Sequence, residues 1–313
     1  MSTPSEPATS DSSETWPALP WAEWRDTCET LHMWTQVVGK VKLALTPFLN
    51  HYWQVGFHVT ARGMTTGLIP YAERAFDVTF DFVDHRLAIR CTDGRESALP
   101  LGPCSVADFY ERFMAALRSN DVAVAIDTTP TEVLDPIPFE RDRTHAAYNP
   151  TYVWRWWQIQ VQTVKVLQTY RSTFAGKSSP ILFYWGSFDL NATRFSGRPA
   201  QPPQGPRFYR LSENQENVSC GFWPGNPGMR ETGFREPAYY AYAYPEPAGF
   251  KEAAVRPSAA YYNGELGEFL LHYDDARRAP APEQAILAFF QSVYEAGATL
   301  GGWDRAALEQ PPG

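Results

Sequence analysis

Four cations occupy matching places in the two halves of this 313-residue sequence. Lys40 and Lys177 each follow a glycine at the predicted end of a long helix. Arg62 and Arg194 each stand nine positions after a tryptophan. Guanidinium groups bind carboxylate or phosphate through paired hydrogen bonds, and lysine adds a point charge. If the halves pack about a pseudo-two-fold axis, the four side chains form an anion clamp in one cleft; otherwise they neutralise helix ends or pair with surface acids.

Aromatic and proton-transferring residues complete the predicted ligand site. Trp185 and Trp223 are the expected walls, because an indole ring stacks on a planar or cationic group. Trp223 belongs to the Pro/Gly-rich segment 221–226, which either covers the pocket or inserts its rings into the core. Asp189 is flanked by apolar residues, which predicts either a general base or ligand anchor, or a buried ion pair. His32 is the second candidate for proton transfer, since imidazole titrates near neutral pH.

A mononuclear metal enzyme is a third hypothesis for this chain. It requires at least three side chains within bonding distance of an ion, drawn from His32, His51, His58, Asp189 and Glu29. A di-metal bundle is excluded, because the predicted helix 151–174 contains neither glutamate nor histidine. Residues 176–178 (GKS) lack the earlier glycine of a phosphate-binding loop, and no dinucleotide fingerprint occurs. The sequence therefore indicates no cofactor.

Hydrophobic periodicity predicts the elements that position these residues. Helices are expected near residues 20–38, 106–117, 151–174 and 282–293. Strands are expected at 52–60, 65–71, 76–83, 87–91, 122–126, 181–185, 188–194, 240–244, 259–262 and 266–272, with a hairpin turn at 263–264 (NG). Both halves thus read helix, strands, helix. This order predicts an α+β fold of two pseudo-repeated helix–antiparallel sheet–helix units packed as one compact body.

The predicted domain organisation follows from this repeat. Residues 1–15 are expected to form a disordered tail and residues 16–126 the first α+β unit. Residues 127–150, which carry four prolines, are the expected linker. Residues 151–308 are the expected second unit, with an insertion at about 197–258, and residues 309–313 are a second disordered tail.

Charge and composition narrow the class of protein. The 27 Lys and Arg against 35 Asp and Glu give a net charge of −8, which argues against nucleic acid or an anionic membrane as a partner. No apolar run approaches a membrane span, and residues 1–15 lack the pattern of a signal peptide. Four scattered cysteines do not indicate a disulfide framework. We therefore expect a cytoplasmic protein.

Several phrases of the sequence resemble a bacterial family catalogued as domain of unknown function 5996. They are LHMWTQVVGK at 31–40, TARG at 60–63, FYWGSFDL at 183–190, TRFSG at 193–197, GFWPG at 221–225 and YAYPEP at 242–247. The resemblance extends from about residue 16 to residue 308. It implies a bacterial, cytoplasmic protein, and it brings no catalytic residue.

The leading functional hypothesis is a binding site in the cleft between the two halves. The expected ligand is a small organic molecule with an anionic or planar part, and the sequence leaves open whether the protein converts it. The alternative is an interaction or scaffold protein without catalysis, in which the aromatic residues belong to the core or to a partner surface. The sequence does not determine the oligomeric state.

Overall fold

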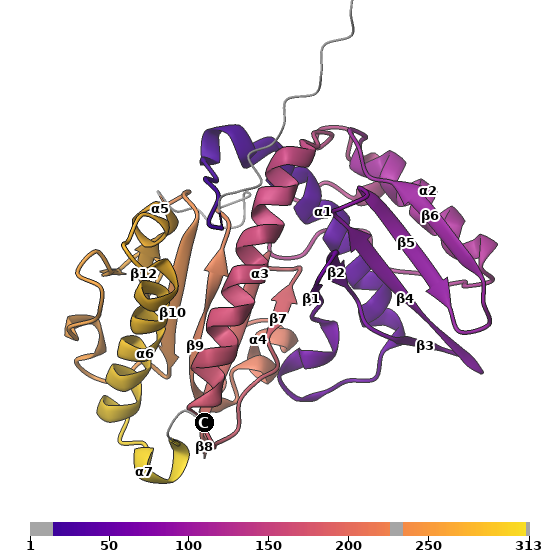
Figure 1. Ribbon diagram of the computed structural model, residues 1–313. Helices are drawn as coiled ribbons and strands as arrows, with labels where there is room; N and C mark the ends of the chain where they lie inside the picture. The colour runs from indigo at the N-terminus through magenta and orange to yellow at the C-terminus, as the bar shows by residue number, and fades with distance from the viewer. Residues whose placement is uncertain (1–14, 226–233, 311–313) are drawn as a thin grey trace, which may run out of the picture.

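The computed structural model describes residues 15–225 and 234–310 (Figure 1). The predicted tail segments 1–14 and 311–313, and position 226 of the predicted covering loop, lie outside these residues. Two antiparallel sheets and the helices packed on them form the fold, which confirms the predicted α+β class. The internal repeat and the domain boundaries stay predictions.

The first sheet comes from the N-terminal half and has the order β1-β2-β4-β5-β6, with β3 also paired to β4. On β4, Phe76, Val78 and Phe80 are buried and alternate with less buried residues, so one face of the sheet is apolar. Helices α1 (Trp21–Leu45) and α2 (Val106–Ser119) cover that face (Figure 1). The strands are β1 (His58–Thr60), β2 (Gly63–Thr65), β3 (Ile69–Tyr71), β4 (Arg74–Asp81), β5 (Arg86–Cys91) and β6 (Glu96–Pro100).

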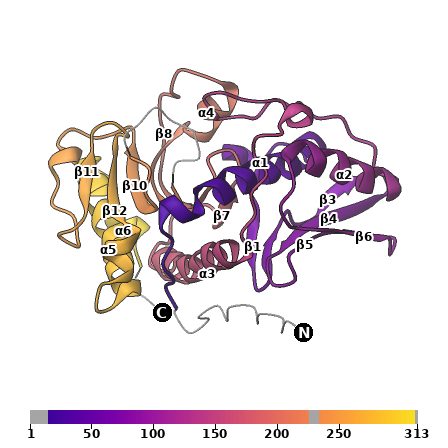
Figure 2. The ribbon, with the colours of Figure 1, turned by 90° about the horizontal axis from the view of Figure 1, so that it is seen from above.

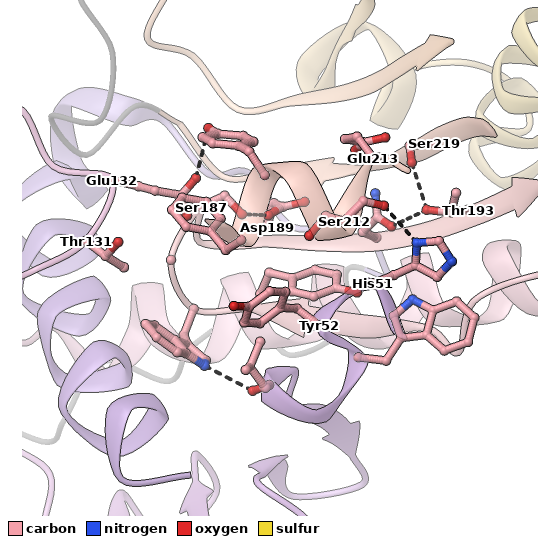
Figure 3. Close-up of a pocket in the computed structure, with 18 of the residues that line it drawn as sticks. His51, Tyr52, Thr131, Glu132, Ser187, Asp189, Thr193, Ser212, Glu213 and Ser219 are labelled. Atoms are coloured by element: carbon pink, nitrogen blue, oxygen red, sulfur yellow. Dashed lines mark hydrogen bonds between the residues drawn. The ribbon is translucent and has the colours of Figure 1, made fainter. Parts of the chain in front are cut away.

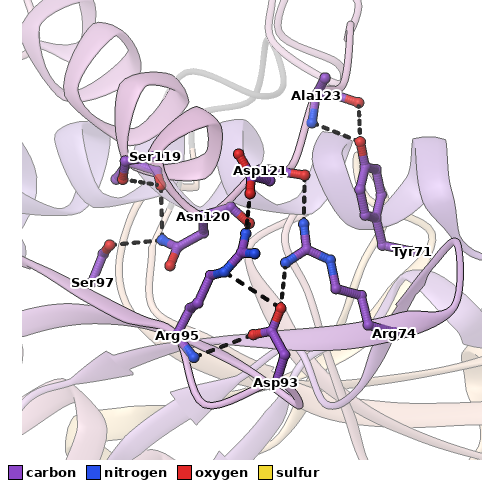
Figure 4. Close-up of polar contacts among 10 residues, drawn as sticks. Tyr71, Arg74, Asp93, Arg95, Ser97, Ser119, Asn120, Asp121 and Ala123 are labelled. Carbon is purple, nitrogen blue, oxygen red and sulfur yellow. Dashed lines mark hydrogen bonds and ion pairs between the residues drawn. The ribbon is translucent and has the colours of Figure 1, made fainter.

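A network of charged side chains ties this sheet to the C-terminal end of α2 (Figure 4). Arg74 donates to the carboxylate of Asp93 at 2.7 Å and to the backbone carbonyl of Asp121. Arg95 pairs with the carboxylates of both aspartates. The network thus joins the turn after β5 to the residue that follows α2.

The second sheet has the order β11-β12-β10-β9-β8-β7 and is covered on one face by α3 (Pro150–Ser172) and α6 (Pro282–Leu300). Its central strands β9 and β10 come from the predicted insertion at 197–258, which therefore supplies part of the sheet. Its strands are β7 (Leu182–Tyr184), β8 (Asp189–Pro199), β9 (Gln215–Trp223), β10 (Ala238–Tyr244), β11 (Tyr261–Asn263) and β12 (Glu268–His272). The shorter helices are η1 (Asn50–Val55), η2 (Phe139–Arg141), α4 (Arg207–Ser212), η3 (Phe250–Glu252), α5 (Tyr273–Arg277) and α7 (Arg305–Leu308).

The two sheets meet edge to edge. Phe57, just before β1, and Phe183 of β7 exchange both backbone hydrogen bonds, at 2.8 and 2.9 Å. Helices α1 and α3 lie on opposite sides of this junction (Figure 2). Trp156 of α3 stacks on Trp24 of α1 and on Phe188, with ring centroids 5.8 and 5.2 Å apart. One hydrophobic core therefore runs through both halves of the molecule.

Three predicted strands differ in the structure. The expected strand 65–71 is divided into β2 and β3, which each pair with β4. The expected strand 52–60 begins only at His58, because Asn50–Val55 forms the 3-10 helix η1. Inside η1, His51 and Tyr52 adopt the left-handed conformation with φ of 56° and 59°. The expected strand 122–126 forms no strand.

None of the helices in residues 15–225 and 234–310 combines the length and the apolar content required to cross a bilayer.

Gly39 allows α1 to approach the turn after β7. A Cβ atom at this position would lie 2.3 Å from the indole ring of Trp185. Alanine is favoured over glycine by about 1 kcal/mol in a helix, but overpacking costs about 1 to 3 kcal/mol. Since a Cβ atom 2.3 Å from a ring is a severe clash, we expect the upper part of the overpacking cost, so that Gly39→Ala lowers the free energy of unfolding by about 2 kcal/mol in urea denaturation.

The matched control is Gly102→Ala, because a Cβ atom at Gly102 meets no atom within 4 Å. This variant should unfold at the wild-type urea concentration. Equal stability of the two variants would contradict the close approach at Gly39.

Candidate functional site

A pocket of about 440 Å³ lies on the face of the second sheet that is turned away from α3 and α6 (Figure 3). Strands β8, β9 and β10 form its floor. The first half of the chain supplies part of the wall through the end of α1, through η1 and through residues 127–132. The remaining wall comes from α4 and from the turn between β7 and β8. The pocket thus lies where the two halves meet, with a volume typical of small-molecule sites.

The floor is polar although it is buried. Successive residues of a strand point to opposite faces, so β8 directs one set of side chains into the apolar core and the other into the pocket. The pocket-facing residues with at most 8% exposure include Asp189, Asn191 and Thr193 of β8, Asn217 and Ser219 of β9, and Tyr240 of β10. The neighbouring residues Leu190, Ala192, Val218 and Cys220 belong to the core under α3 and α6.

These buried polar groups form one hydrogen-bonded chain. Asn191 donates to the Tyr240 hydroxyl at 2.9 Å and accepts from the Thr193 hydroxyl at 2.9 Å. The Ser219 hydroxyl donates to the Thr193 hydroxyl at 2.7 Å, and its oxygen also lies 3.3 Å from the amide oxygen of Asn217. Because the polar groups of the floor bond to one another, the sheet holds them at little desolvation cost.

Each end of the chain carries a carboxylate. Asp189 accepts hydrogen bonds from the hydroxyls of Ser187 and Tyr240. Glu213, which follows α4, accepts from Asn217 at 2.6 Å and from Tyr242 at 3.0 Å. Burial raises the pKa of the Glu213 carboxyl above its ordinary value.

The charges of both carboxylates act on the phenol of Tyr184, a residue of β7. Burial, and next the charges of Asp189 and Glu213, raise the pKa of its phenol. The hydroxyl therefore stays protonated at neutral pH, and it is a hydrogen-bond donor in the pocket lining.

The left-handed residues of η1 lie across the pocket from Glu213 (Figure 3). The Nδ1–H of His51 donates to the carbonyl of Ser212 at 2.8 Å, so Nε2 carries the lone pair and accepts from Lys177 Nζ at 2.7 Å. Burial lowers the pKa of both His51 and Lys177. A left-handed conformation costs about 1 to 3 kcal/mol for a residue other than glycine, and such strain concentrates at functional sites.

Carboxylates outnumber cations among the described residues of the lining. Among the described residues, Lys40 is the only Lys or Arg in the lining. Its Nζ lies 3.4 Å from the carboxylate of Asp127, so these two charges offset each other. The four other carboxylates of the lining are Glu132, Asp189, Glu213 and Glu268.

Aromatic side chains form much of the remaining lining. They come from both halves of the chain and include Tyr52, Trp53, Tyr184, Trp185, Phe195, Phe208, Tyr209, Trp223, Tyr240 and Tyr242. The rings of Tyr240 and Tyr242 stack with centroids 6.3 Å apart and planes at 15°. Aromatic faces attract cations and cover apolar groups, so the pocket combines negative charge with flat apolar walls.

Four of the residues predicted from the sequence line this pocket: Lys40, Trp185, Trp223 and Asp189. Trp185 donates through Nε1 to the carbonyl of Val55 at 3.0 Å, which ties the two halves together at the wall. Trp223 ends β9 and stacks on Phe234 at 5.9 Å, so it is held by the sheet.

His32 and Lys177 lie behind the lining. His32 is fully buried in α1, and its Nε2–H donates to the carbonyl of Gly186 at 2.9 Å. Burial lowers the pKa of His32 to about 4, so it is neutral at physiological pH. Lys177 lies over the rings of Trp53 and Phe195, at 5.5 and 4.7 Å from their centroids, and donates to Gln215 at 2.8 Å.

Arg62 and Arg194 do not reach the pocket, so the predicted four-cation clamp does not form. Arg62 is 49% exposed on the first sheet and binds Asp81 and Asp84. Arg194 is fully buried on the opposite face of the second sheet, 3.6 Å from the centroid of the Tyr170 ring. Its position on β8, one residue after Thr193, directs it into the core under α3.

The predicted histidine-based metal site is not assembled. Among residues 15–225 and 234–310, no group of three or more His, Cys, Asp or Glu side chains is placed to hold a metal ion. His32 bonds to a backbone carbonyl, and the Nε2 of His51 accepts from Lys177.

Sequence reasoning missed several residues of this site. The alternation of Tyr240, Tyr242 and Tyr244 indicated a strand, and the same alternation placed two of these phenols on one face. His51 was considered only as a metal ligand. Glu213 carried no local signal, because its position depends on the contact of α4 with η1.

The fold and the pocket define an α+β protein with two joined antiparallel sheets and an acidic, aromatic cavity at their junction. The chain belongs to a family of unknown function, DUF5996, whose family model matches residues 16–310. This match confirms the resemblance found in the sequence. No curated protein and no solved structure matches the chain significantly.

The buried neutral His32 makes stability depend on pH. Its pKa is about 4 in the folded state and 6.5 in the unfolded chain, so the unfolded state gains a proton first as the pH falls. Between pH 7 and pH 5 this histidine should lower the free energy of unfolding by about 2 kcal/mol. Urea denaturation at pH 7 and pH 5 measures this change. Between these pH values the free energy of unfolding should fall by about 2 kcal/mol less in His32→Gln than in the wild type, because glutamine does not titrate.

NMR titration of the His32 ring gives an independent check. The ring should not titrate between pH 8 and pH 5 in the folded protein. A midpoint near 6.5 would rule out this account of its burial.

Proposed function

We propose that this protein binds a small organic molecule that carries a positively charged amine, in the pocket between its two halves. The observation that carries this proposal is the charge of the lining: five carboxylates and a single lysine among the described residues. A buried negative charge attracts a cation strongly, because the interior screens it less than water does. The same field repels an anion. We therefore propose a cationic group in place of the anionic part of the anionic or planar ligand expected from the sequence.

The walls support the same ligand chemistry. Ammonium and guanidinium groups are attracted to the faces of tryptophan and tyrosine, and the rings also cover the apolar part of such a molecule. Trp185, Tyr240 and Tyr242 supply faces of this kind.

The floor favours a cation over an uncharged polyol. The polar side chains of the floor already bond to one another, so part of their hydrogen-bonding capacity is occupied. They are Asn191, Thr193, Asn217 and Ser219. Charge is therefore the stronger feature that the pocket presents to a ligand. Asp189 and Glu213, held by neighbouring hydroxyl and amide groups, are the residues we propose to receive the amine.

A ligand panel tests the proposal directly. Isothermal titration calorimetry with primary amines, carboxylic acids and sugars should detect binding of amines alone. Loss of a hydrogen bond to a charged group costs about 1.5 to 3 kcal/mol, so Asp189→Asn should weaken amine binding at least about tenfold.

Glu283→Gln is the matched control, because Glu283 is an exposed carboxylate on α6 that pairs with Lys165. It should bind amines as the wild type does. Binding of acids or sugars in preference to amines would refute the proposal, as would equal loss of affinity in both variants.

The raised pKa of Glu213 gives the binding a pH dependence. As the pH falls, this carboxyl gains its proton earlier than an ordinary glutamate does, while an aliphatic amine stays charged. Amine affinity should therefore decrease from pH 8 to pH 5, and the decrease should be smaller in Glu213→Gln. Dissociation constants across this range measure the effect, and affinity that rises on acidification would contradict it.

A further inference from the structure

We propose that α4 is a lid over the pocket and that His51 is the positioning residue that holds this lid closed. Through its two ring nitrogens, His51 joins the last turn of α4 to Lys177, and it thereby fixes the position of Glu213. This inference goes beyond the proposed function, because it concerns access to the pocket and does not depend on which ligand binds there.

Helix α4 lies over the pocket without a core of its own. Phe208, Tyr209 and Ser212 belong to the lining, yet none of the residues of this helix is buried. The segment 201–206, which leads from β8 to α4, is largely exposed. Helix α4 lies on the side of the molecule opposite to α3 (Figure 2). A segment with few buried contacts opens locally at a low free-energy cost, so α4 is suited to move.

Side chains of α4 cross from the second half of the chain to the first. Arg207 lies over the ring of Phe48, 5.7 Å from its centroid, and donates to the Tyr52 hydroxyl at 3.4 Å. Tyr209 donates to the Glu132 carboxylate at 3.2 Å. Both hydrogen bonds are exposed, so water competes for the same groups. These contacts guide α4 to the first half but hold it weakly.

His51 makes the contact that is shielded from water, because this residue is only 5% exposed. Its Nδ1–H donates to the carbonyl of Ser212 at 2.8 Å, and the last carbonyls of a helix have no partner within the helix. Its Nε2 accepts from Lys177, which in turn donates to Gln215 at 2.8 Å. The ring also contacts Phe195 of β8, with centroids 4.6 Å apart. His51 therefore connects α4 to side chains that the second sheet holds in place.

The closed position of α4 determines where Glu213 lies. Glu213 follows Ser212 directly, so the carbonyl that His51 binds is one residue away from a carboxylate of the pocket. In this position Glu213 accepts hydrogen bonds from Asn217 and Tyr242. Opening of α4 would therefore withdraw Glu213 and uncover the polar floor.

The hydrogen bond between Lys177 and His51 requires a neutral imidazole. Protonation of Nε2 would remove the acceptor and place two cations in contact. The charged groups around the ring are Lys177, from the segment before β7, and Glu213, which lies beyond Ser212; β8 contributes the ring of Phe195.

This chemistry gives the lid a pH dependence. Burial, and also the charge of Lys177, lower the pKa of His51 in the closed state. As the pH falls, the open state therefore binds a proton first, and α4 should open more at pH 5 than at pH 7.

Hydrogen–deuterium exchange of the full chain measures this opening. Peptides that contain residues 207–213 report on α4, and peptides of α2 are the internal reference at each pH. In His51→Asn the new residue tolerates the left-handed conformation, but its shorter side chain does not reach both Ser212 and Lys177. We expect α4 of this variant to exchange about fivefold faster at pH 7, or more.

His85→Asn is the matched control. His85 is also left-handed, with φ of 46°, and its Nδ1 lies 2.8 Å from the Tyr148 hydroxyl, in the turn between β4 and β5. Exchange of α4 should be the same in this variant as in the wild type.

The pH series separates the proposed role from a merely structural one. Between pH 7 and pH 5, exchange of α4 relative to α2 should increase in the wild type. The increase should persist in Glu213→Gln, whose side chain does not titrate, and it should be smaller in His51→Asn.

The outcomes decide the inference without any ligand. Equal exchange of α4 in His51→Asn and His85→Asn would refute it, and so would a full wild-type pH effect in His51→Asn. Circular dichroism shows whether each variant is folded, and the wild-type series needs no variant: unchanged relative exchange from pH 7 to pH 5 also refutes the lid. Faster exchange in His51→Asn alone, together with no binding of amines to the wild type, would support the lid and refute the proposed function.

Discussion

Strand alternation in β8 and β9 is the constraint on which the rest of the structure depends. Both faces of these strands are covered over residues 189–195 and 217–223, where every residue is buried, yet only one face is apolar. Helices α3 and α6 pack on the apolar face. The other face carries Asp189, Asn191 and Thr193, which must find partners because buried polar groups are costly when unpaired. They obtain them from β9 and β10, and this requirement explains why β8, β9 and β10 lie side by side.

Local patterns predicted most of the helices, because a periodic apolar stripe needs no information from distant residues. In α1, Trp24, Cys28 and Leu31 recur at helical spacing, and the structure buries all three. Of the central strands, β10 was predicted over residues 240–244, and β9 was not predicted. They lie in a Pro/Gly-rich part of the chain, and their place in the sheet depends on pairing with β8 and β12. Segment η1 was read as a strand because its left-handed residues have no distinctive sequence signal.

Part of the site could be predicted from residue types, and part could not. Asp189 was identified because a carboxylate among apolar residues is unusual. Arg194 was grouped with it, although the two differ by five positions on one strand. An odd separation places side chains on opposite faces, so they could share a pocket only if the strand were interrupted. Glu213 depends on the tertiary contact between α4 and η1 and could not be found locally.

Arg194, which the sequence grouped with the ligand site, is a residue of the core in the structure. Arg194 is fully buried beneath β8, among the rings of Tyr170, Phe174 and Tyr294, and it donates to the carbonyl of Tyr170. The carboxylates of the pocket lie on the other face of the same sheet. The cation predicted to bind the ligand is thus held in the core under α3 by a backbone carbonyl and by aromatic rings, because its place on β8 turns its side chain away from the pocket.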